Sequence, residues 1–209
     1  MTRTRSSMLS TLALLLTAGA AGAQIAANGI TILVDDPVLE PGQSTTVRME
    51  AYFDARDFCM SWVATSLLSS AGAQGLEGPS LIQPMDGPGA TAGVIDGAGV
   101  GGIIAGQLHG FIGAGIFGDP TNPMAFWEVT YTAPTDVAAP LSVELETLTT
   151  RFDVHTDPWE FSEESRLDDF AEGEATIRVV PAPAGVAVLG GLLLAARREP
   201  RRIVRPPVA

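Results

Sequence analysis

The sequence contains no lysine, and all 12 of its basic residues are arginine. It has one cysteine, Cys59, and two histidines, His109 and His155. A single thiol cannot form an internal disulfide, so the fold must depend on core packing. The cysteine and histidines are too few and too scattered for a structural zinc site. Cys59 stands between Phe58 and Met60, and we predict that it is a small buried hydrophobic residue.

Positive charge is scarce in the middle of the chain. Residues 24–179 hold five of the arginines and 23 of the 24 acids, which gives this part a net charge of −18. Such a charge repels a phosphate backbone and argues against nucleic-acid binding. It is typical of a protein that stays dispersed outside the cell, and it leaves open a calcium ion or a basic partner. With 46% apolar residues, the chain can still bury a core.

The first residues have the pattern of a secretory signal peptide. Arg3 and Arg5 precede an uncharged apolar run over 8–21, which ends in small residues at Ala21 and Ala23. The run is too short to span a bilayer comfortably, and its basic, apolar and small-residue parts follow the order of a cleavable signal. We predict that residues 1–23 are removed and that the mature chain begins at Gln24.

The C-terminus carries a second targeting pattern. Proline cannot continue a strand ladder or a helix, so a Pro-Ala-Pro sequence at 181–183 ends the preceding strand. Residues 184–196 are then free of charge, and Arg197 and Arg198 follow at once. This order predicts a short apolar transmembrane helix with its basic end in the cytoplasm. The glycines of the run disfavour the alternative, a buried helix of the domain core.

This tail resembles the PEP-CTERM sorting signal of Gram-negative bacteria that make extracellular polymer. That signal combines a Pro-Glu-Pro motif, a transmembrane stretch and a basic cluster, and the matching residues here are Pro181, Ala182, Pro183, Arg197 and Arg198. Ala182 replaces the usual glutamate, and the residues after Arg198 run longer than usual. The resemblance covers residues 180–209. It implies recognition and processing by an exosortase, an integral-membrane enzyme, and a final place on the cell surface or in the matrix.

Between these ends, short strand patterns alternate with turns. Residues 45–53 and 141–148 alternate apolar and polar side chains, as half-buried strands do. Further strands are predicted over 30–34, 60–68, 125–132, 151–155 and 175–179. No long stretch keeps a helical period. These patterns predict one mostly β extracellular domain over 24–179, an antiparallel β-sandwich.

The order of the strands and turns resembles cohesin-type and immunoglobulin-like sandwiches of secreted bacterial proteins. A strand, a Glu-Pro-Gly turn at 40–42 and an alternating strand come first, and an aromatic strand with a Thr-Ala-Pro-Thr-Asp turn at 132–136 comes later. The resemblance implies a module that binds a dockerin-type protein or a carbohydrate. It identifies no individual binding residues.

Glycine is concentrated between residues 87 and 118, where it supplies 12 positions. This stretch either forms short strands with close backbone packing or is a mobile surface loop, and its apolar groups favour strands. Gly97, Gly99 and Gly102 match the spacing of a dinucleotide-binding loop. A helix must follow such a loop, and the glycines of 103–115 prevent one, so we predict no cofactor site.

The acid-rich segment 157–174 is the clearest candidate site of the domain. Three interpretations stay open. It is a solvated loop or short helix held to the sheet by its aromatic side chains, a calcium site with Asp157, Asp168 and Asp169 as ligands, or a sugar platform made by Trp159 and Phe161. The spacing of an EF-hand loop is absent.

No residues in the sequence form a recognisable catalytic motif. His109 and His155 belong to no catalytic triad pattern, and we predict that they are ordinary loop or strand histidines. The sequence therefore predicts a non-catalytic, exported protein of the cell surface or extracellular matrix, whose partners are the membrane, an exosortase and possible surface polymers or proteins. A cohesin-like binding module is the alternative. A secreted polymer hydrolase is the third class, and it would need two carboxylates facing each other across a cleft.

Overall fold

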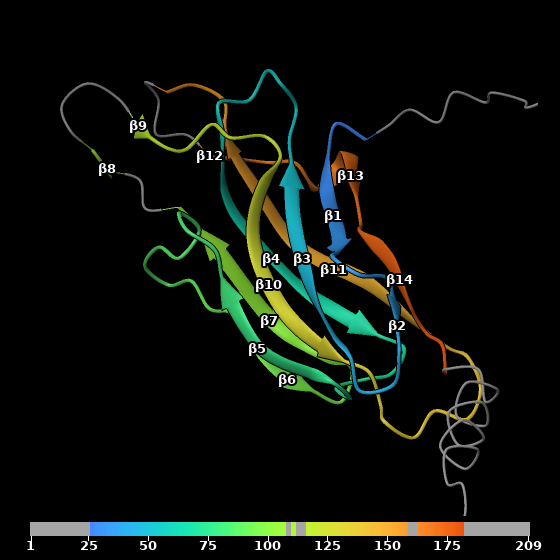
Figure 1. Ribbon diagram of the computed structural model, residues 1–209. Helices are drawn as coiled ribbons and strands as arrows, with labels where there is room; N and C mark the ends of the chain where they lie inside the picture. The colour runs from blue at the N-terminus through green and yellow to red at the C-terminus, as the bar shows by residue number, and fades with distance from the viewer. Residues whose placement is uncertain (1–25, 108–109, 112–115, 159–162, 182–209) are drawn as a thin grey trace, which may run out of the picture.

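Two β-sheets face each other across one apolar core in the computed structural model of the chain, which describes residues 26–107, 110–111, 116–158 and 163–181 (Figure 1). Sheet A has the order β13 (Phe170–Ala171), β1 (Asn28–Val34), β3 (Ser44–Tyr52), β10 (Met124–Thr132) and β5 (Leu76–Leu81). Sheet B has the order β2 (Val38–Leu39), β14 (Glu174–Val179), β11 (Leu141–His155), β4 (Cys59–Ser69), β7 (Gly99–Gly106) and β6 (Val94–Asp96).

Four small elements complete the described part of the chain. β12 (Glu163–Ser165) pairs with β11, and β8 (Gly110–Phe111) pairs with β9 (Ile116–Phe117). A single 3₁₀ turn, η1 (Leu167–Asp169), precedes β13. Within the described ranges, no helix has the length and apolarity needed to cross a membrane. The predicted helix over 184–196 lies outside the described residues.

Alternating side chains of both sheets fill the core, as the sequence predicts. On β3 the inward residues Val47, Met49 and Ala51 are fully buried, and on β11 Val143 and Leu145 have almost no exposed surface. This two-residue period is what a strand with one face on the core requires. The mostly β sandwich is therefore confirmed.

The prediction of a purely antiparallel sandwich is wrong in two places. β13 runs parallel to β1, and β14 runs parallel to β2, while the other pairs between named strands are antiparallel. The cause is the path of the last segment, which first joins sheet A as β13 and then crosses to sheet B as β14 (Figure 1). This segment ties the two sheets together.

The two strands predicted over 141–148 and 151–155 form one strand, β11. Its pairing with β4 shifts register between Thr149 and Arg151. A bulge of this kind adds a residue to one strand and reverses which side chains face inward. Val143 and Leu145 point inward before the shift, and Phe152 and Val154 point inward after it. Because the bulge interrupts the alternation of apolar and polar residues, the sequence predicts two strands where the structure has one.

The glycine-rich stretch forms strands, which confirms the favoured interpretation. β6 and β7 form a hairpin, and β7 pairs with β4 at the centre of the domain. Gly99 has a φ of +143°, and an added Cβ there would overlap the carbonyl oxygen of Leu67. Gly97, Gly99 and Gly102 thus belong to a β-hairpin, in which Gly99–Gly106 continues as strand β7 where a dinucleotide loop would begin a helix.

Candidate functional site

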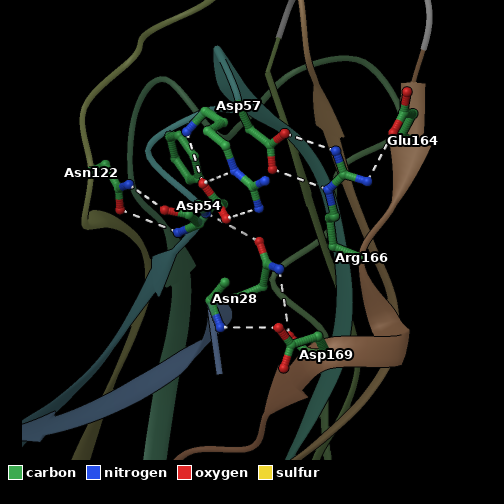
Figure 2. A network of polar contacts seen from close by, with 10 residues as sticks. Asn28, Asp54, Asp57, Asn122, Glu164, Arg166 and Asp169 are labelled. Atoms are coloured by element: carbon green, nitrogen blue, oxygen red, sulfur yellow. Dashed lines mark hydrogen bonds and ion pairs between the residues drawn. The ribbon is translucent and has the colours of Figure 1, made fainter. Parts of the chain in front are cut away.

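A polar pocket of about 420 Å³ opens at the end of the sandwich where β1 begins. Four segments that are distant in the sequence contribute to it: the start of β1, the β3–β4 loop, the residue after β11, and the turn around η1. The lining residues are Ala27, Asn28, Asp54, Arg56, Asp57, Thr156, Arg166 and Asp169. Figure 2 shows most of these polar side chains converging on one another.

A bidentate ion pair forms one wall of the polar pocket. Arg166 donates from Nε to Oδ2 of Asp57 at 3.1 Å and from Nη2 to Oδ1 at 2.8 Å. The Asp57 side chain is only 4% exposed, so the pair is largely removed from water. Arg166 also donates to Glu164 at 2.8 Å (Figure 2). The hydrogen bond with Asp57 raises the pKa of Arg166, so the guanidinium group stays charged.

A second ion pair stands on the rim. Arg56 donates to Asp54 from Nε at 2.9 Å and from Nη2 at 2.6 Å, and its backbone N–H also donates to Asp54 at 2.9 Å. These hydrogen bonds lower the pKa of Asp54 to about 2. A general acid needs a raised pKa so that it carries a proton near neutral pH. Asp54 therefore does not supply the proton donor that a polymer hydrolase requires.

Two asparagines hold the backbone around the polar pocket. Asn28 accepts the N–H of Asp54 at 3.3 Å and donates to the carbonyl of Asp169 at 3.4 Å (Figure 2). Asn122 donates to the carbonyl of Phe53 at 2.6 Å and accepts its N–H at 3.2 Å. The loop between β3 and β4 is thus fixed by side chains from β1 and from the residues before β10.

The acid-rich segment 157–174 is divided among several elements. Asp168 and Asp169 lie exposed on η1, and Asp157 is half-buried after the end of β11. In the part of the chain that the structure describes, no three acidic, histidine or cysteine side chains gather as a metal site would require. Asp157, Asp168 and Asp169 are therefore not brought together as one ligand set. Trp159 and Phe161 lie outside the described residues.

The two described tryptophans differ in exposure, since Trp127 is buried and Trp62 is partly exposed. Trp127 is fully buried, and its Nε1 donates to the carbonyl of Ala92 at 2.9 Å. The guanidinium of Arg151 lies 5.6 Å from the ring centroid of Trp62. Gly106 also lies against this ring, since an added Cβ there would come within 2.7 Å of it. A stacking platform needs an exposed ring face, which Trp127 lacks, and the ring of Trp62 is already contacted by Arg151 and Gly106.

Cys59 and His155 are both buried on sheet B. Burial raises the pKa of the Cys59 thiol to about 12, which keeps it protonated at neutral pH. A nucleophilic cysteine needs the opposite shift, so the prediction of a small buried hydrophobic residue is confirmed. His155 is the last residue of β11, as the strand interpretation predicts. His109 lies outside the described residues.

The outward surface of β11, β14 and β4 forms a second candidate, which we call the sheet B face. Glu146 lies directly opposite Glu174, and both side chains are exposed. These two residues and Glu144 line a cavity of about 340 Å³. Leu148 is 53% exposed beside them, at the edge of a hollow of about 90 Å³ that Leu68 also lines. This surface thus presents three glutamates and an exposed leucine.

The targeting residues fall at or beyond the limits of the described chain. β14 ends at Val179, and Val180 then donates its N–H to Leu39 at 2.8 Å. Pro181 follows as the last described residue. The remaining candidates of the sorting and cleavage motifs, Ala23, Gln24, Ala182, Pro183, Arg197 and Arg198, lie outside the described residues.

The sequence analysis missed the polar pocket. Asp57 and Arg166 are 109 positions apart, and no local pattern links them. The one local signal was the Asp-Ala-Arg-Asp cluster at 54–57, which interrupts a region of apolar strands.

No protein family model matches the chain, and no curated protein matches its sequence. Among solved structures, it is similar to the seventh ScaB type I cohesin from Pseudobacteroides cellulosolvens, with 16% identity and a TM-score of 0.45 over 74% of this chain and 95% of that one. It is also similar to a cohesin module from a Clostridium perfringens family 33 glycoside hydrolase, with 10% identity and a TM-score of 0.46 over 75% and 99% of the chains. Similarity at this level says nothing about what the chain binds.

Proposed function

We propose that this chain is an exported, non-catalytic module of the cell surface or extracellular matrix, delivered by its N-terminal signal and sorted through its tail by an exosortase-type enzyme. The observation that carries this proposal is the extent of the core. Among the described residues, the core begins at Ile30 and ends at Val179. Both sheets are joined by the β13–β14 segment before that point. All strands of sheets A and B thus come from the part of the chain between the two targeting segments.

The position of the last strand supports a role for the tail outside the domain. β14 lies between β2 and β11 inside sheet B, and only residues 180–183 separate it from the apolar run. Figure 1 shows that β14 ends at the opposite end of the sandwich from the start of β1. A processing cut after Pro181 would leave every described strand in place.

The ion pairs of the two buried or rim aspartates and the protonated thiol of Cys59 support a non-catalytic role. In the polar pocket, Asp54 and Asp57 each form an ion pair with an arginine. Outside the pocket, Cys59 is a buried thiol that stays protonated. None of the three is arranged as an acid, a base or a nucleophile.

Localisation in a polymer-forming Gram-negative host that has an exosortase tests this proposal. Deleting 181–209 should move the protein from the envelope to the medium with an unchanged cooperative melt. Replacing Arg197 and Arg198 by Gln should cause accumulation of an unprocessed form. Arg201→Gln with Arg202→Gln is the matched control, because it removes equal charge farther from the apolar run. N-terminal sequencing of the exported form should start at Gln24, and a cytoplasmic protein starting at Met1 would refute the proposal.

The sheet B face favours a second candidate function, a cohesin-like module that binds a protein partner. Leu148 is exposed beside the hollow, and no described arginine forms an ion pair with Glu146 or Glu174. Like charges directly opposite each other destabilise a sheet, and a basic partner would relieve this. Capture of a dockerin-bearing protein that is lost in Leu148→Arg and kept in Leu33→Arg, an exposed leucine of sheet A, would support binding at this face.

A further inference from the structure

We propose that the polar pocket binds one amino-sugar unit of an extracellular polysaccharide. The ammonium group of the sugar pairs with Asp169, and its hydroxyl groups bind the two arginines and Thr156. The inference rests on the matrix location in the proposed function and names the class of polymer that the module meets there. Every residue of the site belongs to the described part of the chain.

The size and lining of the polar pocket favour a small, hydrophilic ligand. Its volume of about 420 Å³ lies within the range of about 300–1,000 Å³ that is typical of small-molecule sites. Such sites are usually lined by apolar side chains, whereas seven of the eight lining residues here are polar or charged. An apolar ligand would remove these groups from water without replacing their hydrogen bonds. A ligand with several hydroxyl groups replaces them.

Two of the three carboxylates in the polar pocket are already neutralised. Asp54 pairs with Arg56. Asp57 pairs with Arg166 (Figure 2). Asp169 forms no ion pair with a described arginine, so one negative charge is left for a ligand. An ammonium group supplies one positive charge and three hydrogen-bond donors, while an anionic ligand would meet the excess negative charge.

The two arginines keep donors for the hydroxyl groups of a sugar. A guanidinium group has five N–H groups. Arg166 uses three of them in its ion pairs, and the Arg56 side chain uses two in its ion pair with Asp54. Thr156 also lines the polar pocket, and its hydroxyl forms no hydrogen bond with another described residue. A sugar hydroxyl both donates and accepts, so it can bind an arginine N–H and the Thr156 hydroxyl together.

The polar pocket lies at the end of the sandwich that is far from the tail. It opens where β1 begins, and β14 ends at the opposite end (Figure 1). A protein anchored through the residues after Val179 therefore presents this pocket away from the membrane, toward the extracellular polymer. The negative charge of residues 24–179 raises the local concentration of a cationic polymer around the domain.

Saturation-transfer NMR with the methyl glycosides of glucosamine, N-acetylglucosamine and glucose tests the proposal. The glucosamine glycoside should bind about fivefold more tightly than the other two, because an exposed ion pair contributes up to a factor of this size. The acetyl group removes the positive charge, and glucose carries a hydroxyl in place of the amine. Methyl glucuronide, which is an anion, should bind most weakly. Equal affinities for the four glycosides, or no binding at tens of millimolar, would overturn the proposal.

Two aspartate variants separate a specific contact from general attraction by the acidic domain. Asp169→Asn should lower the affinity for the glucosamine glycoside to that for the glucose glycoside. The fold should tolerate this change, since Asn28 binds the backbone carbonyl of Asp169, and the new amide oxygen can still accept the N–H of Ala27. Asp168→Asn removes the adjacent charge of the same turn outside the lining and should change neither affinity. Equal losses in the two variants would mean that net charge alone attracts the sugar, and the proposal would be wrong.

A third variant and a simple amine test the contribution of the hydroxyl groups. Thr156→Val should weaken the binding of all three glycosides of the first series about threefold, the effect of one hydrogen bond, with an unchanged thermal melt. Butylamine, which carries the ammonium group without hydroxyls, should bind more weakly than the glucosamine glycoside. Butylamine binding as tightly as the glycoside would refute a sugar site. The protein is purified from whichever cell fraction contains it, so cell fractionation reports separately on export and sorting.

Discussion

Arg166 and Asp57, 109 positions apart in the sequence, meet in a bidentate ion pair with N–O distances of 2.8 and 3.1 Å. The pair joins the turn at η1 to the β3–β4 loop, and Asp57 is almost completely buried. A buried carboxylate left without its partner is costly, because neither water nor another cation replaces the lost contacts.

The Arg166→Met variant should therefore lower the free energy of unfolding by about 3 kcal/mol in urea denaturation. Asp57→Leu in the same chain should recover most of the loss, since the uncompensated charge is then removed. Arg56→Met is the control, because its ion pair is exposed on the rim and should contribute little. An Arg166→Met protein as stable as the parent would contradict this account.

The lowered pKa of Asp54, on the rim of the polar pocket, makes the stability of the folded state depend on pH. Its folded pKa of about 2 lies below the ordinary value of about 3.9. The ion pair thus stabilises the folded state above pH 4, and this contribution is lost as the pH falls from about 4 to about 2. A carboxyl titration by NMR should give a midpoint near 2, and Arg56→Gln should move it upward. A midpoint near 4 in the parent would show that the pair does not form in solution.

The glycine-rich hairpin allows a comparison of two neighbouring glycines. Gly99→Ala should destabilise the protein by about 3 kcal/mol, because the Cβ meets the Leu67 carbonyl and the backbone has a positive φ. Gly97→Ala should change stability little, since an added Cβ there has no neighbour within 4 Å. Both positions belong to the same dinucleotide-like spacing. Equal effects on a thermal melt would mean that the hairpin packs differently.

Calcium should have little or no effect on the melting temperature. A ligand that binds only the folded state stabilises it, but Asp157, Asp168 and Asp169 do not form one ligand group among the described residues. A rise of several degrees in millimolar calcium, smaller in magnesium and lost in Asp168→Asn with Asp169→Asn, would establish a calcium site in this segment.

The sequence predicts best those strands that pack one face on the core, because apolar and polar side chains must then alternate along the strand. β3 shows this at Val47, Met49 and Ala51. β5 was missed, because Gly78 and Pro79 interrupt its pattern and are tolerated only at a sheet edge. The polar pocket was missed for a different reason. Its buried ion pair joins Asp57 and Arg166, which are 109 positions apart and become neighbours only in the folded domain, and single-sequence patterns contain no information on that contact.

The interior position of β14 determines how the domain would carry mechanical load. The chain leaves β14 directly toward the tail, and β14 is hydrogen-bonded to β2 on one side and to β11 on the other. Tension applied to Val179 along the direction of β14 would act parallel to these strands, so it would shear both ladders together instead of unzipping them one bond at a time. A surface protein tethered by its C-terminus would thus resist extraction at the strand nearest its anchor.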